Sequence, residues 1–312
     1  MRQNLVVAAL FAVVLAACTA FAPAPAPFPA TPVSFPDYSA YDGIEHYATP
    51  EAYAQARADT RFVMERIAYP SDGLEVYAYL YRPATTPTAP MPVIVFNRGS
   101  YTREDFAPEV LMPGRRLAEA GFLVIAPMYR GSGGAGGHDA FGGEDLRDIF
   151  NLMPVIKSLP YADVSRVFLY GESRGGVMAL MALRDGFPAR AAAVYGAITD
   201  MAPLIAEGGI YRGLGPTVWP GFPANEAETG ETRSAIRWAD RINAPLLIMH
   251  GGADEDVAPA NAIALADKLK ALGKPYQLKI FEGETHVIPG KAAERDADAI
   301  AWFRVHDSTG SN

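Results

Sequence analysis

Three residue types that together perform nucleophilic catalysis occur in this chain in the order Ser173, Asp254 and His286. Ser173 lies in residues 171–175 (GESRG), a G-x-S-x-G pattern. Apolar residues precede the pattern and good helix formers follow it, which predicts a strand, a tight turn and a helix with the serine at the turn. A serine hydroxyl is a weak nucleophile and needs a neighbouring base to accept its proton.

His286 and Asp254 are the candidate base and its orienting acid. Histidine suits proton transfer because its ordinary pKa lies near neutral pH. His286 follows the apolar run at residues 278–281, and Asp254 follows another at residues 246–249. A carboxylate beside the imidazole would fix its tautomer and stabilise the imidazolium. Both side chains should therefore lie at the same sheet edge as Ser173.

Other residues compete for these two roles. Asp256 is the rival acid. His250 is the rival base, although it lies so close to Asp254 in sequence that we expect it to shape the turn. His138, in a glycine-rich loop, is a weaker alternative.

The reaction also needs donors for the oxyanion that forms when a carbonyl is attacked. We expect the backbone N–H of Arg174, at the predicted helix start, to be one donor. A backbone N–H around Ser100, after the strand at residues 93–96, is the expected second donor. The side chains of Asn97 or Tyr101 are alternative donors.

Short apolar runs alternate with helical segments along most of the chain. The expected strands are at residues 93–96, 122–126, 167–170, 191–197, 246–249 and 278–281. Such alternation predicts an α/β fold with a mostly parallel sheet covered by helices on both faces. Residues 62–67 and 74–81 flank a Ser-Asp-Gly turn and predict antiparallel strands at the N-terminal edge.

One stretch, residues 199–231, breaks this alternation and is rich in glycine, proline and aromatic residues. We interpret it as an insertion over the active site, with a surface loop as the alternative. Tyr211 and Trp219 within it, and Tyr101 elsewhere, are the candidate substrate-binding residues.

Composition excludes several other functions. The net charge of −8, with no basic stripe, argues against nucleic acid as a partner. A single cysteine, Cys18, rules out an internal disulfide and a thiolate metal cluster. The five histidines show no helical zinc spacing. We therefore expect neither a cofactor nor a metal, and the sequence leaves the oligomeric state open.

The N-terminal residues predict export. Residues 5–17 form an apolar run of signal-peptide length, and the run ends in Leu-Ala-Ala before Cys18. This ending is similar to the lipobox of bacterial lipoproteins, which implies removal of residues 1–17 and lipid attachment to Cys18. Residues 18–49 then read as a proline-rich linker and residues 50–312 as the catalytic domain. The expected location is membrane-anchored, either periplasmic or at the cell surface.

The motifs around the three candidate residues resemble those of the prolyl oligopeptidase family, which has the α/β-hydrolase fold. They are GESRGG at residues 171–176, HGGAD at 250–254 and GETH at 283–286. The resemblance covers about residues 60–305 and implies Asp254 as acid and His286 as base. It departs at residues 97–101 (NRGSY), where related hydrolases often have His-Gly-Gly, and the sequence has no room for the β-propeller of larger members.

The expected function is cleavage of peptide or amide bonds in small substrates by a serine hydrolase. A carboxylesterase acting on small acyl esters is the alternative, because the same three residues permit both reactions. A non-catalytic binding protein on a hydrolase scaffold is a third reading, which the intact set Ser173, Asp254 and His286 disfavours.

Overall fold

A computed structural model of the chain describes residues 28–41, 43–100 and 108–307. Its strands form one sheet of nine, in the order β1-β2-β3-β5-β4-β6-β7-β8-β9. The strands are β1 (Ala30–Pro32), β2 (Phe62–Ser71), β3 (Leu74–Pro83), β4 (Met91–Asn97), β5 (Leu123–Pro127), β6 (Ala162–Glu172), β7 (Ala192–Tyr195), β8 (Leu246–Gly251) and β9 (Tyr276–Phe281). Cys18 and Tyr101 lie outside the described residues.

Parallel and antiparallel pairing divide the sheet as expected. The strands from β5 and β4 through β9 pair in parallel, whereas β1, β2 and β3 add antiparallel strands at the N-terminal edge. The hairpin of β2 and β3 turns at Asp72 and Gly73, both in the left-handed region. The predicted α/β fold is therefore confirmed.

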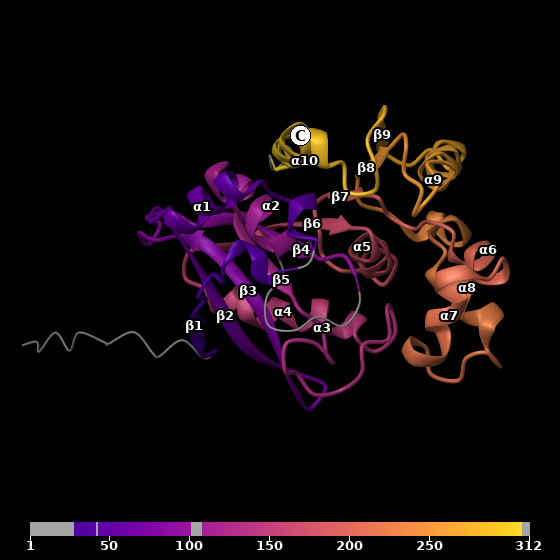
Figure 1. Ribbon diagram of the computed structural model, residues 1–312, viewed down its shortest axis with the longest axis horizontal. Coiled ribbons are helices and arrows are strands. Elements are labelled where there is room, and N and C mark those ends of the chain that lie inside the picture. Colours follow the sequence, from indigo (N-terminus) through magenta and orange to yellow (C-terminus); the bar gives the residue numbers. More distant parts are fainter. Residues whose placement is uncertain (1–27, 42, 101–107, 308–312) are drawn as a thin grey trace, which may run out of the picture.

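Helices cover both faces of the sheet (Figure 1). One face packs against α1, α2 and α10 through an apolar cluster that includes Tyr53, Leu117 and Phe303. The other packs against α3, α4, α5 and α9. The helix bounds are α1 (Pro50–Ala58), α2 (Pro108–Glu119), α3 (Leu146–Phe150), α4 (Leu152–Ser158), α5 (Arg174–Arg184), α9 (Ala260–Ala271) and α10 (Ala292–Val305).

Residues 199–231 form helices between β7 and β8. They are α6 (Met201–Ala206), α7 (Gly209–Val218) and α8 (Glu226–Arg233), and Figure 1 shows them grouped beyond α5, on the side of the sheet away from the hairpin. We call this group the cap. In the described part of the chain, no helix is both long and apolar enough to span a bilayer.

The folded body begins before residue 50, where the sequence placed the end of a linker. β1 pairs with β2 in the register Ala30↔Ile67, and Ile44 and Ala48 are buried in the core. Tyr53 of α1 donates a hydrogen bond to the carbonyl of Pro36. The proline-rich composition therefore did not reveal that residues 30–49 pack onto the catalytic domain.

Candidate active site

Ser173 occupies the sharp turn between β6 and α5, with φ of 48° and ψ of −118°. The two flanking glycines are required by close backbone approach. A Cβ on Gly171 would lie 2.6 Å from the carbonyl oxygen of Gly175, and a Cβ on Gly175 would lie 1.9 Å from that of Asn97. The strained turn projects the serine above the carboxyl ends of the parallel strands, where α/β folds bind ligands.

Ser173, His286 and Asp254 form one hydrogen-bonded chain. Ser173 Oγ lies 2.8 Å from His286 Nε2, and His286 Nδ1 lies 2.8 Å from Asp254 Oδ2. An ionised carboxylate only accepts hydrogen bonds, so Nδ1 carries the proton and Nε2 is free to accept the serine proton. The three residues, distant in sequence, thus have the arrangement of a nucleophile, a base and an orienting acid.

The Asp254 carboxylate is buried but well bonded. Its Oδ1 accepts hydrogen bonds from the backbone N–H groups of Asp256 and Val257, both at 2.9 Å. Burial alone would raise the pKa of Asp254, but hydrogen bonds from His250, His286 and Val257 outweigh it and hold this pKa well below its usual range. The carboxyl is therefore ionised whenever the imidazole can act.

His286 responds to the opposing effects of burial and charge. Burial disfavours the imidazolium, but the hydrogen bond and charge of Asp254 outweigh this and raise the pKa of His286 above its ordinary 6.5. The charges of Glu172 and Asp256 add to the rise. The site therefore favours a protonated imidazole, the form that the base takes after it accepts the serine proton.

The rival residues lie close to the site but make other contacts. His250 is fully buried, and its Nε2 lies 2.8 Å from the carbonyl oxygen of Val257 and 2.9 Å from Asp254 Oδ2. Both neighbours are acceptors, so this nitrogen donates and His250 braces the turn. His138 contacts the carbonyl oxygen of Val218 in the cap, and Asp256 bonds Asp254 through its backbone.

The loop after β8 carries Asp254 and Asp256, and we call it the acid loop. Its carboxylates are also of the type that binds metal ions. One ligand atom each of Asp254, Asp256 and His286 lie within 4.8 Å of one another. Two of the three are already bonded to each other, and the imidazole also contacts Ser173. The arrangement fits acyl transfer better than metal ligation.

The expected oxyanion donors belong to two segments, the start of α5 and the loop after β4. As the first residue of α5, Arg174 has a backbone N–H with no carbonyl of its own helix to bond. Ser100 follows β4 in the left-handed region, with φ of 57°. Its carbonyl oxygen accepts from Arg174 Nη1 at 3.1 Å, so the turn and the loop after β4 are tied together.

The buried side chain of Arg174 is a feature that sequence reasoning missed. Its guanidinium bonds Asp139 and Asp145, with contacts of 2.6 to 2.8 Å, and all three side chains are almost inaccessible to solvent. Both acids lie in the glycine-rich loop after β5, which is thereby fixed beside the nucleophile. Only the arginine inside the motif and the acids in that loop hinted at this pairing.

Glu172, the residue before the nucleophile, is also buried and was not singled out. It accepts hydrogen bonds from Tyr47 at 2.7 Å and from Tyr195. A Cβ on Gly99 would come within 2.7 Å of its Oε1, so the loop after β4 passes directly over this carboxylate. Through Tyr47, the segment before α1 becomes part of the site.

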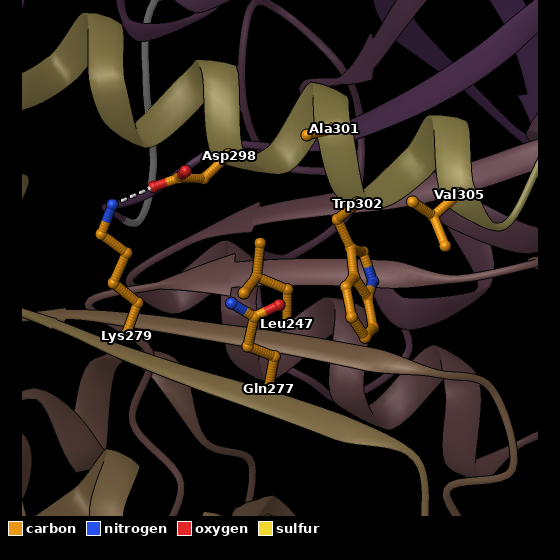
Figure 2. Close-up of a pocket in the computed structure, with 7 residues that line it drawn as sticks. All are labelled: Leu247, Gln277, Lys279, Asp298, Ala301, Trp302 and Val305. Carbon is orange, nitrogen blue, oxygen red and sulfur yellow. Dashed lines mark hydrogen bonds and ion pairs between the residues drawn. The ribbon is translucent and has the colours of Figure 1, made fainter.

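A cavity of about 630 Å³ reaches His286. Its lining comprises His46, Tyr47, Ala253, Glu255, Asp256, Thr285, His286 and Val287. A smaller hollow lies between α10 and the strands β8 and β9, where Lys279 is bonded to Asp298 (Figure 2). That hollow includes none of the three candidate catalytic residues.

The candidate substrate residues have different outcomes. Tyr211 of α7 is half-buried near the acid loop: burial, together with the charges of Asp256 and Asp254, raises its pKa to about 12. Trp219 is only 2% exposed and packs against Phe141 and Phe222, so it is a core residue of the cap and not part of the cavity lining. The aromatic side chain of Trp219 indicated a packing role, but the sequence did not show whether it packs against substrate or against the protein core.

The sheet, the serine on its sharp turn and the hydrogen-bonded acid and histidine define an α/β-hydrolase. The model of the prolyl oligopeptidase family matches residues 115–307. Uncharacterized peptidase YtmA of Bacillus subtilis (strain 168) is 31% identical over 232 residues, which are 73% of this chain and 88% of that protein. The chain belongs to the prolyl oligopeptidase family and is a serine peptidase.

Longer proteins share the same region. The Acylamino-acid-releasing enzyme of Homo sapiens is 26% identical over 254 residues, which are 75% of this chain but 34% of that enzyme. Pyrococcus horikoshii acylaminoacyl peptidase has a TM-score of 0.68 at 21% identity, over 85% of this chain and 45% of that one. A Mycobacterium tuberculosis puromycin-hydrolyzing peptidase has a TM-score of 0.67 at 24% identity, over 80% and 40%. These two structures show the shared fold.

Proposed function

We propose that this protein hydrolyses short peptides or related small amides through an acyl-enzyme formed on Ser173. The observation that carries the proposal is the continuous hydrogen-bonded chain from Ser173 Oγ through His286 to Asp254. Family membership supports a peptide or amide bond as the target.

The geometry assigns a role to each residue. Ser173 attacks the carbonyl carbon while His286 Nε2 takes its proton, and Asp254 stabilises the resulting imidazolium. The carbonyl oxygen becomes an oxyanion, which the N–H groups of Arg174 and Ser100 receive. The imidazolium then protonates the leaving amine, and water repeats the attack to release the acid and restore Ser173.

The test is activity of the purified protein toward a panel of short peptide anilides and p-nitrophenyl acetate. We expect turnover of anilides and fluorophosphonate labelling, both abolished in Ser173→Ala. If only the ester is turned over, the protein is a carboxylesterase and the peptidase assignment is wrong. If the folded wild type shows neither turnover nor labelling, the proposal that this protein is a hydrolase is refuted.

We also propose that the protein is exported and anchored by lipid on Cys18. The apolar run at residues 5–17 and the Leu-Ala-Ala-Cys sequence that ends it support this. Expression in a bacterial host with a radiolabelled fatty acid tests the anchor. Label should appear in the wild type and be absent from Cys18→Ala, and an unlabelled wild type would refute it.

A further inference from the structure

The cavity that reaches His286 carries uncompensated negative charge. Glu255 and Asp256 both line it and are exposed to solvent. Among the described residues, no lysine or arginine lines it, and its basic side chains are the imidazoles of His46 and His286. A concave surface lined by one sign of charge attracts ligands of the opposite sign.

Asp256 is a carboxylate beside the triad that takes no part in it. One of its carboxyl oxygens lies within 4.8 Å of a ligand atom of both His286 and Asp254. The backbone N–H of Asp256 is bonded to Asp254, but its side chain has no hydrogen-bond or ion-pair partner among the described residues. This charge therefore faces the cavity unpaired.

An aromatic side chain lines the same cavity as this carboxylate. Tyr47 lines the cavity from the segment before α1. A cavity that holds both a carboxylate and an aromatic ring suits an organic ammonium group.

The short distance between Asp256 and Ser173 limits how far from the cleaved bond that ammonium group can lie on a substrate. The imidazole that Asp256 adjoins is itself 2.8 Å from Ser173 Oγ, where the scissile carbonyl must sit. An extended chain advances about 3.3–3.6 Å per residue. A positive group paired with Asp256 thus falls within about two residues of the scissile bond.

We propose that Asp256 is a specificity-determining residue that favours substrates with a cationic amine within about two residues of the cleaved bond. The proposal rests on the hydrolytic function above and narrows its substrate class. The amine has two possible sources, a free α-amino group or a basic side chain. Glu255 strengthens the same field from a position more distant from the triad.

Matched substrates separate these sources. Alanine p-nitroanilide has a free α-amino group, and its N-acetyl derivative replaces that cation with a neutral amide. Nα-acetyl-lysine p-nitroanilide and its Nε-acetylated form differ in the charge of the side chain. We compare kcat/KM between the two members of each pair at pH 7.5. Both members release the same p-nitroaniline, so a change that affects the chemical step equally leaves their ratio unchanged.

Wild type should prefer the charged member of at least one pair. In Asp256→Asn, the charged-to-neutral ratio should fall by about 2- to 5-fold, the upper part of the range expected for an exposed ion pair. The preference should also shrink at high salt. The control is Asp267→Asn, which removes an exposed carboxylate on α9 outside the cavity lining and should keep the wild-type ratio.

The results have separate consequences for the proposal and for the function. A wild type that favours neither charged substrate, or an Asp256→Asn ratio within twofold of wild type, overturns the role of Asp256. Because neutral substrates would still be cleaved in that case, the hydrolytic function would stand. Absence of turnover of all four substrates by the wild type would instead refute the proposed cleavage of short peptide amides. The pair that responds to Asp256→Asn identifies the source of the amine.

Discussion

Gly175→Ala tests whether the turn around the nucleophile is as tightly packed as the structure indicates. A Cβ at this position would lie 1.9 Å from the carbonyl oxygen of Asn97 and 2.6 Å from that of Arg98. Both atoms belong to the backbone at the end of β4, so no side chain can rotate away. The start of α5 and the end of β4 must separate by roughly 1 Å to restore a normal contact.

That separation affects stability and catalysis. Overpacking in a close-packed interior typically costs about 1–3 kcal/mol of unfolding free energy. Displacement of a catalytic group by about 1 Å costs about 10²-fold in rate. We therefore expect Gly175→Ala to lose about 2–3 kcal/mol of stability and at least about 100-fold in kcat/KM.

The assay measures kcat/KM on a peptide anilide together with denaturant unfolding. Gly213→Ala in α7 is the matched control, because a Cβ there meets no atom within 4 Å. It should keep its activity and gain up to about 1 kcal/mol from helix propensity. A Gly175→Ala protein with activity within threefold of wild type would show that the turn tolerates the methyl group and that this packing argument is mistaken.

Four further predictions concern the site and the cap. Asp254→Asn should remain folded, but its kcat/KM should fall about 10³- to 10⁴-fold because the imidazole loses its fixed tautomer. In the wild type, kcat/KM should fall as pH drops through a value above 6.5, since only neutral His286 accepts the serine proton and its pKa is raised. Glu172→Gln removes one charge that raises this pKa, so the acid limb of the pH profile should move to lower pH, with Glu45→Gln as the exposed control. Trp219→Ala should lower the unfolding free energy by about 3–5 kcal/mol as a core truncation, and an unchanged denaturation midpoint would contradict its burial.

The sequence was sufficient for the fold and for the residues that meet at Ser173. Alternating apolar runs and helix formers report burial on both faces, so the strand at residues 246–249 and the helix beginning at Arg174 matched β8 and α5 closely. The strand expected at residues 191–197 is shorter in the structure, where β7 covers Ala192–Tyr195. Local patterns constrain element type more strongly than their ends.

The remaining features depend on contacts between residues far apart in the chain. Tyr47 and Glu172 are 125 positions apart, and nothing local marks either as a hydrogen-bond partner of the other. The segment before α1 has a linker-like composition, yet Ile44 and Ala48 within it are buried. Trp219 shows the converse, since an aromatic residue in an insertion fits a cavity lining and a small core equally well.

The packing around the nucleophile explains the residues of the GESRG motif other than the serine. Its glutamate and arginine make specific contacts, as its glycines do. Glu172 lies against Gly99, the guanidinium of Arg174 holds the carbonyl of Ser100, and Gly175 admits the carbonyl of Asn97. Each of these three motif positions therefore contacts the loop after β4, which supplies the second oxyanion donor in our mechanism. The nucleophile and that loop are consequently positioned by one set of contacts, so a substitution in the motif should displace both together and lower transition-state stabilisation more than substrate binding.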